Sequence, residues 1–181
     1  MGLSVCVIDS ASEMFEAVRQ LRTRYLGENP AQEEDYERRE ALRDALSYHL
    51  VYLDDGHVVG TLRATPLGHD LSFAERAVDV HAHFPIPTDA FDANRLVMDE
   101  RYRGGRHLRT FLLQAAIWLK ANTHLRFISA LCRGQLAALY VGLGGRVLVD
   151  DVTWATAQAE RRYSLVYLEL EQVYQTVKRG N

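Results

Sequence analysis

A basic turn followed by a long amphipathic helix is the segment of this sequence best suited to bind an anion. After an apolar run that ends at Met98, the chain reads Asp99 to Arg106 and then shows a helical pattern from about His107 to Asn122. The first turn of a helix presents unpaired N–H groups and a partial positive charge, which together bind phosphate. A solvated basic helix face without a ligand is the alternative. The basic side chains here are Arg101, Arg103, Arg106, His107 and Arg109.

Two histidines, His81 and His83 in the string DVHAHFP, have the spacing of neighbouring residues on one strand face. Two imidazoles on one face are compatible with a metal ion. The sequence nearby holds no cysteine and no Glu-x-x-His pattern to complete a ligand set. We therefore expect no metal site and interpret His83 as lining a substrate pocket.

The pattern of apolar residues predicts a chain that alternates strands and helices. An Asp55-Gly56 pair between two apolar runs is typical of a β-hairpin. A strand, a helix and a strand over 92–131 predict a parallel βαβ unit. The predicted strands are 3–8, 49–53, 58–64, 92–98, 127–131, 147–156 and 163–170, and the predicted helices begin near 12, 107 and 135.

Three segments are harder to interpret. The charged stretch 32–46 has few apolar residues and fits either a solvated helix or an ordered lid. The stretch 65–91 shows no firm periodicity, and loops of that length in compact domains are usually functional. The segment 168–178 would complete a sheet edge or form a dimer contact.

Composition limits the classes of protein that this chain can represent. Its 181 residues are expected to form one domain, 1–181. A net charge of −3 gives no overall attraction to nucleic acid, and no apolar run approaches the roughly 20 residues of a membrane span. Cys6 and Cys132 lie in apolar runs, and no targeting pattern is visible, so we expect a cytoplasmic protein in which both cysteines are small, buried apolar residues.

Two strings in the second half of the chain resemble the motifs of the GNAT acyltransferases. NRLVMDERYRGGRHLRTFLLQAA is similar to the strand, V-x-P-x-Y-R-G turn and helix of that family, with Met98 to Gly104 in the turn. LAALYVGLGGR resembles its second motif, in which Tyr140 ends a short helix and Gly144 begins the turn that follows. The resemblance covers roughly 58–149. It implies an α/β (α+β) fold with a mixed sheet of about six to seven strands, flanked by helices and splayed where a thioester binds.

The turn departs from the R-G-x-G-x-G pattern of the family at two positions. Arg106 and Leu108 occupy the places of the second and third glycines. Because glycine allows a pyrophosphate to lie against the backbone, we expect these side chains to crowd a CoA pyrophosphate. A phosphopantetheine arm on an acyl carrier protein has a single phosphodiester and would suit the altered turn.

A second, more diffuse resemblance points to acyl-homoserine lactone synthases and N-acyl amino acid synthases, which share this fold. The segments that carry it are Leu21-Arg22-Thr23-Arg24, the acidic stretch 33–35, Gly60-Thr61-Leu62-Arg63 with Pro66, Phe73, and Asp92-Ala93-Asn94-Arg95. Acyl carrier protein as donor and an amino-acid-like acceptor are what this resemblance implies.

The resemblances also imply roles for individual residues. The strand residues Leu96, Val97 and Met98 would offer backbone groups to the pantetheine arm, and the turn and helix start would bind its phosphate through Arg103, Gly104, Gly105, Arg106, His107, Leu108 and Arg109. Asp92 is the candidate base, acting through a water or after burial has raised its pKa, and the alternative is an aspartate that serves a turn. Tyr140 is the candidate acid for the leaving thiolate, or else a core residue. Arg63 and Arg95 would anchor the acceptor, or else form structural ion pairs.

The sequence therefore predicts an acyltransferase that moves an acyl group from a phosphopantetheine thioester to the amine of a small, amino-acid-like acceptor. The donor would be an acyl carrier protein or acyl-CoA, used as a cosubstrate with no tightly bound cofactor. Nucleic acid and metal ions are not expected as partners. The alternatives are an acetyl-CoA-dependent amine N-acetyltransferase and a non-catalytic thioester-binding module with the same fold.

Overall fold

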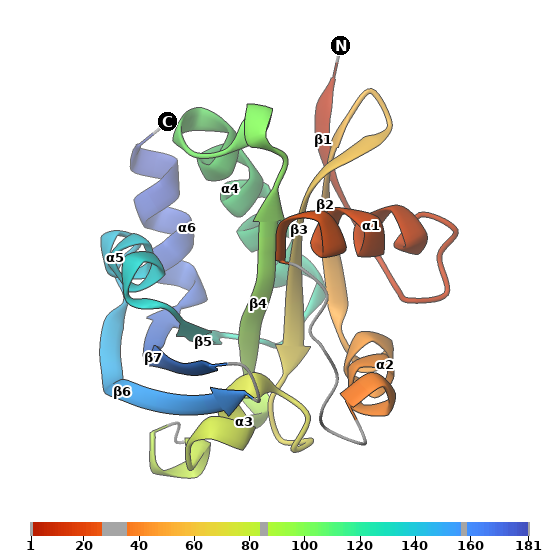
Figure 1. Cartoon of the computed structure of the whole chain (residues 1–181). Helices are drawn as coiled ribbons and strands as arrows, with labels where there is room; N and C mark the ends of the chain where they lie inside the picture. The colour runs from red at the N-terminus through yellow and green to blue at the C-terminus, as the bar shows by residue number, and fades with distance from the viewer. Residues whose placement is uncertain (1, 27–35, 84–86, 157–158, 181) are drawn as a thin grey trace.

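Seven strands form one mixed sheet in the order β1-β2-β3-β4-β5-β7-β6 (Figure 1). A computed structural model of the chain describes residues 2–26, 36–83, 87–156 and 159–180. Neighbouring strands are antiparallel except β4 and β5, which are parallel. The predicted mixed sheet and its parallel βαβ unit are thus confirmed. The strands are β1 (Leu3–Ile8), β2 (Tyr48–Asp54), β3 (His57–Pro66), β4 (Ala90–Met98), β5 (Phe127–Cys132), β6 (Arg146–Thr156) and β7 (Ala159–Glu169).

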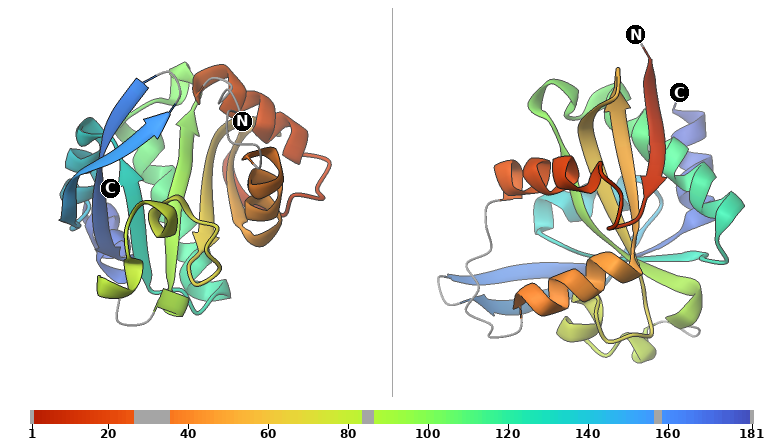
Figure 2. Two further views of the ribbon diagram at one scale, coloured as in Figure 1. Left: turned by 60° about the horizontal axis from the view of Figure 1, so that its bottom comes forward. Right: turned by 90° about the vertical axis from the view of Figure 1, so that its right-hand side faces the viewer.

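Helices cover both faces of the sheet, with α1 and α2 on one face and α4 and α6 on the other (Figure 2). The helix α3 lies at one end of the sheet, and α5 lies beside α6 (Figure 1). None of the described helices is both long enough and apolar enough to cross a membrane. The helices are α1 (Phe15–Leu26), α2 (Tyr36–Leu46), α3 (Phe73–Ala77), α4 (Gly105–Asn122), α5 (Gly134–Gly142) and α6 (Leu170–Arg179), and the 3-10 turns are η1 (Val80–Ala82), η2 (Pro87–Asp89) and η3 (Glu100–Tyr102).

The feature of the sheet that matters most for function is the split between β4 and β5. The two strands pair only from Ala90–Phe127 to Asp92–Ser129. Beyond that pair β4 stays hydrogen-bonded to β3, while β5 stays paired with β7. The register of β4 against β3 shifts at this point, and Arg95 takes a left-handed φ of 54°, as expected for a β-bulge. The bulge bends β4 away from β5 and opens the sheet.

The largest apolar core lies between the sheet and the pair α4 and α6. Phe111 and Leu119 of α4 and Val173 and Val177 of α6 are buried in it at helical spacing. A second, smaller cluster lies where α3 packs against the sheet, and a third lies under α1. Both faces of the sheet are therefore covered, and the split between β4 and β5 lies between two packed layers.

The structure corrects three interpretations of the sequence. Segment 168–178 is mostly the helix α6, and it adds no strand to the sheet edge. The stretch 65–91 is not one long loop, because it contains α3 and two 3-10 turns. His81 lies within η1 and His83 lies in the turn after it, so the two imidazoles do not share a strand face.

Candidate active site

The split leaves one edge of β4 without a neighbouring strand over its last residues. Val97 and Met98 pair with Thr61 and Gly60 of β3 on one side only. Val97 and Met98 are buried, and Leu96 is half-buried. The three residues predicted to contact a pantetheine arm therefore lie along the open edge of a strand, where unpaired backbone groups are able to bind an extended ligand.

Two glycines shape the turn that follows β4 and η3. Gly104 has a φ of 71° and Gly105 a φ of 51°, and a Cβ atom at either position would meet open space. The first backbone hydrogen bond of α4 runs from Leu108 N to Gly104 O at 3.3 Å. The N–H groups of Gly105, Arg106 and His107 precede it and have no partner among the described residues. The turn thus presents free amides at a helix start, which is an anion-binding geometry.

The basic side chains around this turn are not equivalent. Arg103 donates from Nε to Met98 O at 3.0 Å and lies over the ring of Tyr25 at 4.4 Å. Arg101 pairs with Asp99, and Arg109 donates to Gly180 O at 2.9 Å. Arg106 is exposed and has no ion pair among the described residues. Arg106 is therefore the side chain that is free to reach a phosphate, while the other arginines hold the turn in place.

Leu108 was expected to crowd a CoA pyrophosphate at this turn, and its position contradicts that expectation. Its half-buried side chain packs against the largest core cluster and does not lie over the helix start. Of the two residues that replace a glycine of the family pattern, only Arg106 projects its side chain outward. The turn therefore keeps more room for a phosphate or pyrophosphate than the loss of two glycines indicated.

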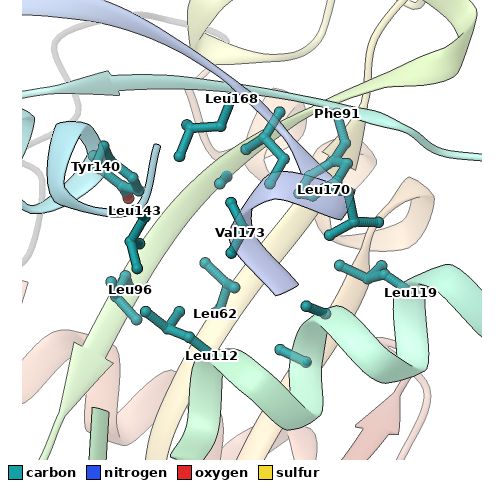
Figure 3. Close-up of a pocket in the computed structure, with 14 residues that line it drawn as sticks. Leu62, Phe91, Leu96, Leu112, Leu119, Tyr140, Leu143, Leu168, Leu170 and Val173 are labelled. Carbon is teal, nitrogen blue, oxygen red and sulfur yellow. The ribbon is translucent and has the colours of Figure 1, made fainter. Parts of the chain in front are cut away.

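An apolar cavity of about 40 Å³ lies on the α4 and α6 side of the split (Figure 3). Side chains of β3, β4, β5, β7, α4, α5 and α6 line it. Leu96 reaches it from the open part of β4, so the cavity adjoins the split. Its walls carry almost no polar surface. The residues that line it are Leu62, Phe91, Ala93, Leu96, Leu112, Ala115, Ala116, Leu119, Ile128, Tyr140, Leu143, Leu168, Leu170 and Val173.

Tyr140 lines this cavity from α5 and is buried in the main core. Burial raises the pKa of its hydroxyl well above the ordinary value, so that the group stays protonated. Gly144, at φ 94°, and Gly145 form the turn after the helix, and Gly145 N donates to Tyr140 O at 3.0 Å. A Cβ atom on Gly145 would lie 2.8 Å from Tyr140 O, which explains the glycine there.

The opposite face of the split carries a buried cluster of charged side chains, which we call the arginine cluster. Arg63 is fully buried and donates from Nη1 to Glu40 at 2.8 Å and to Asp44 at 2.6 Å. Arg95 donates from Nη2 to Tyr36 Oη at 2.6 Å and to Glu40 at 3.1 Å. The cluster joins α1, α2, β2, β3 and β4. Its members are Arg22, Arg43, Arg63, Arg95, Glu40, Asp44, His49, Asn94 and Tyr36.

Positive charge is in excess in this cluster. Among the described residues, four arginines contact two carboxylates, and the nearby His49 adds no charge, since burial lowers its pKa to about 4. Burial opposes ionisation of Glu40, but Arg63, Arg95 and Arg43 together lower its pKa to about 2. Arg22 Nε, Arg63 Nη2 and Arg95 Nε are buried without a hydrogen-bond partner in the described part of the chain. The cluster therefore has both charge and donor atoms left over.

Of this cluster, only Arg63 and Arg95 are predicted site residues. Arg22 and Asn94 lie in segments that carry the synthase resemblance but have no predicted role, and the other members were missed. The charged stretch 32–46 fits a solvated helix or a lid by its sequence, yet Arg43 is 1% exposed and Glu40 and Asp44 point inward. Residues 32–35 of that stretch lie outside the described residues. The available signal was the i, i+4 spacing of Glu40 and Asp44, which places two carboxylates on one helix face.

We expect Glu40→Gln to destabilise the fold by about 3–5 kcal/mol, because it removes the carboxylate that Arg43, Arg63 and Arg95 share and leaves the four arginines of the cluster with Asp44 alone. The pKa of Glu40 lies below its unfolded value of about 4.5, so the stabilisation is present above pH 4.5 and is lost as the pH falls toward 2. Urea denaturation at pH 7 and across pH 2–5 measures both effects. Glu16→Gln, at an exposed ion pair on α1, is the matched control. Equal losses in the two variants would contradict the assignment.

Asp92 lies at the last position where β4 pairs with β5, and it is completely buried. Its Oδ2 accepts hydrogen bonds from Phe73 N at 3.1 Å and from Asn94 Nδ2 at 3.3 Å. Burial raises its pKa to about 6, against the opposing effects of the Phe73 amide and Arg63. Asp92 thus stabilises the start of α3 with one oxygen and has a pKa near neutrality, which is a favourable value for a general base.

His83 is not joined to the arginine cluster. It is half-buried in the turn after η1, and its only hydrogen bond in the described part of the chain runs from its backbone N to Val80 O at 3.0 Å. Its predicted place in the acceptor pocket remains a prediction. No group of three or more potential metal ligands occurs among the residues that the structure describes.

Comparison with solved structures identifies the fold. FeeM, an N-acyl amino acid synthase from uncultured soil microbes, matches with a TM-score of 0.72 at 13% identity, over 97% of this chain and 94% of that chain. MesI, a CoA-dependent acyl-homoserine lactone synthase, matches with a TM-score of 0.63 at 12% identity, over 98% and 94%. An acetyltransferase of the GNAT family from Streptococcus pneumoniae matches with a TM-score of 0.60 at 15% identity, over 93% and 99%.

No protein-family model and no curated protein sequence matches the chain. At identities this low, the structural matches establish the fold only. The reaction has to be inferred from the residues of the site. The chain has the GNAT fold, and the predicted resemblance to that fold, with its two synthase types, is confirmed.

Proposed function

We propose that the chain is an acyltransferase that moves an acyl group from a phosphopantetheine thioester to the amine of a small, amino-acid-like acceptor. The observation that carries this proposal is the split between β4 and β5, because its two sides differ in chemistry. The side toward α4 and α6 opens on an apolar cavity, and the side toward α2 and α3 faces a buried excess of arginine charge. An apolar acyl chain and a charged acceptor would thus approach the same opening from opposite faces.

The donor would bind along the open edge of β4. Its phosphate would contact the free amides of Gly105, Arg106 and His107 and the side chain of Arg106. The pantetheine arm would then follow the strand edge at Leu96 to Met98, where a backbone N–H near Val97 would polarise the thioester carbonyl. The acyl chain would enter the apolar cavity lined by α4 and α6.

The acceptor would bind on the opposite face of the split. Buried charges in proteins are paired, so an excess of buried arginines indicates an anionic partner that arrives from outside. The arginines outnumber the carboxylates even if Asp92 is counted as charged beside Arg63. Arg95 is the most accessible of the cluster's arginines that have unsatisfied nitrogens, with 18% of its side chain exposed. A carboxylate on the acceptor would supply the missing charge through a charge-assisted hydrogen bond.

The reaction itself needs a base and an acid at the split. The amine nitrogen attacks the thioester carbonyl carbon, the new C–N bond forms, and the C–S bond breaks. Asp92 takes the proton from the amine, and the protonated hydroxyl of Tyr140 supplies a proton to the leaving thiolate. The electron pair of the C–S bond leaves with the sulfur, and the carrier is released as a thiol.

Two donor types remain compatible with this site. The inward position of Leu108 favours room for the pyrophosphate of CoA, whereas the single free arginine at the turn suits one phosphodiester. MesI is described as CoA-dependent. An acetyl-CoA-dependent amine N-acetyltransferase is the rival function, and the apolar cavity favours acyl chains longer than acetyl.

The test is detection of acyl transfer by intact mass, with acetyl-CoA, octanoyl-CoA and octanoyl acyl carrier protein as donors and a mixture of the twenty amino acids as acceptor. We expect transfer from an octanoyl donor and an approximately tenfold higher donor KM in Arg106→Glu, because charge reversal repels the phosphate. Arg162→Glu is the control, since Arg162 is exposed on β7. Transfer from acetyl-CoA alone would favour the rival function. A lack of transfer from all three donors would contradict an acyltransferase.

A further inference from the structure

Two buried polar atoms next to the split have no hydrogen-bond partner among the residues that the structure describes. They are Oδ1 of Asp92 and Oγ of Ser129, and both residues are completely buried. Asp92 and Ser129 are paired neighbours on the parallel strands β4 and β5. Because side chains at paired positions of adjacent strands point to the same face, the two groups lie side by side.

Their position along the strands is as informative as their pairing. The Asp92–Ser129 pair is the last one between β4 and β5 before the strands separate. The two side chains therefore lie at the apex of the split, on the face that carries the arginine cluster. The helix α3 packs against both strands there and covers them.

Neither group has a structural role that accounts for its free atom. Asp92 uses Oδ2 for the Phe73 amide and Asn94. The Ala74 amide also lowers the pKa of this carboxylate, but no donor in the described part of the chain lies within hydrogen-bond distance of Oδ1. On the same face of β5, Phe127 and Leu131 flank Ser129 and pack against the second apolar cluster. A serine between two core residues, with an unsatisfied hydroxyl, is unfavourable for stability alone, because buried polar groups are normally hydrogen-bonded.

We propose that Ser129 and Asp92 form a two-point binding site for the attacking amine of the acceptor. This inference rests on the acyl transfer proposed above and adds Ser129 to its machinery. One N–H of the neutral amine donates to Ser129 Oγ, and a second donates to Asp92 Oδ1. The two contacts fix the nitrogen at the apex of the split, with its lone pair directed at the thioester between the strands.

The two residues have different parts in the transfer. As the C–N bond forms and the C–S bond breaks, the proton that faces Asp92 passes to Oδ1. The proton that faces Ser129 stays on nitrogen and becomes the amide hydrogen of the product. Ser129 therefore orients the amine and exchanges no proton, so its loss reduces the rate without removing the base.

The experiment compares Ser129→Ala, Ser129→Cys and Ser129→Thr, with octanoyl-CoA or octanoyl acyl carrier protein as donor and the amino-acid mixture as acceptor. We expect Ser129→Ala and Ser129→Cys to lower kcat/KM for the acceptor by roughly 10- to 100-fold, because a hydrogen bond to the reacting nitrogen is lost. The donor KM and the pH at half-maximal rate stay as in the wild type. Ser129→Thr, which keeps a hydroxyl, recovers most of the activity. The control is Ser164→Ala on the neighbouring strand β7, a buried serine that donates to Asp150.

Full activity in both Ser129→Ala and Ser129→Cys would overturn this inference and leave the proposed function intact. The same holds if Ser164→Ala loses as much activity, or if Ser129→Thr is no better than Ser129→Ala, since the effect would then come from packing. A wild-type protein inactive with every donor would overturn both proposals. Ser129→Cys is nearly isosteric with the wild type, so it gives a result even if Ser129→Ala does not fold.

Discussion

Asp92→Asn is expected to lower kcat for acyl transfer by roughly 100- to 1,000-fold, the typical contribution of a general base. The wild-type rate should rise with pH through about pH 6, because burial raises the pKa of Asp92 to that value and the base must be ionised. The variant should show no such step. A pH profile of kcat from pH 5 to 8 for both proteins is the measurement.

The fold should tolerate this substitution. The asparagine oxygen is able to accept from Phe73 N in place of Oδ2, and its amide group then faces Ser129. As the pH rises through the pKa of Asp92, the activity of the wild type should increase but its stability should decrease. Between about pH 4 and pH 6 the folded state binds a proton that the unfolded state has lost, so the wild type loses stability as the pH rises. Asp92→Asn removes this loss and is expected to be at least as stable at pH 7.

A matched control is available in Asp79→Asn, because Asp79 is exposed and caps η1 through the His81 amide. This variant should keep the wild-type rate and pH profile. If Asp92→Asn instead retained both, Asp92 would serve only to hold the start of α3 through the Phe73 amide. That result would leave the acyltransferase proposal standing with water or another group as the base.

The sequence was most informative where local periodicity and turn chemistry determine structure. β1 begins and ends at the predicted residues, and the hairpin of β2 and β3 forms at Asp55 and Gly56, both at positive φ. The β4-α4-β5 unit was also predicted, because its apolar positions follow the helical period over a long segment. α6 was missed although Leu170, Val173 and Val177 have helical spacing, since the strand pattern of β7 runs directly into it.

The site was only partly predictable because its chemistry depends on long-range contacts. Arg63 and Arg95 are separated from Glu40 by 23 and 55 residues, and no local pattern indicates that they meet. A charged helix such as α2 normally faces solvent, so burial of Arg43 and Glu40 follows only from the arginines on the sheet. Ser129 has no motif at all. Its interest arises from its pairing with Asp92, which depends on the register of two strands.

Arg95→Gln is expected to raise the KM for amino-acid acceptors by roughly 10- to 100-fold, with the donor KM unchanged. Arg95 belongs to a cluster in which described arginines outnumber described carboxylates, and its Nε has no hydrogen-bond partner in the described part of the chain. The side chain is 18% exposed, so the loss of one arginine is less damaging here than at the fully buried Arg63. Steady-state kinetics with the amino-acid mixture, and then with each amino acid that reacts, gives the two KM values.

The decisive experiment compares amino acids with amino-acid amides as acceptors, for the wild type and for variants of Arg95. If Arg95 binds a carboxylate, an amino-acid amide should be a poor acceptor for the wild type, and Arg95→Gln should affect it little. Arg95→Lys separates charge from geometry, because lysine keeps the charge but lacks the planar fork that binds a carboxylate at two points. Arg162→Gln on β7 serves as the control. An equal loss toward acid and amide acceptors would mean that Arg95 supports the bulge of β4, where its φ of 54° already places strain, and does not recognise the acceptor.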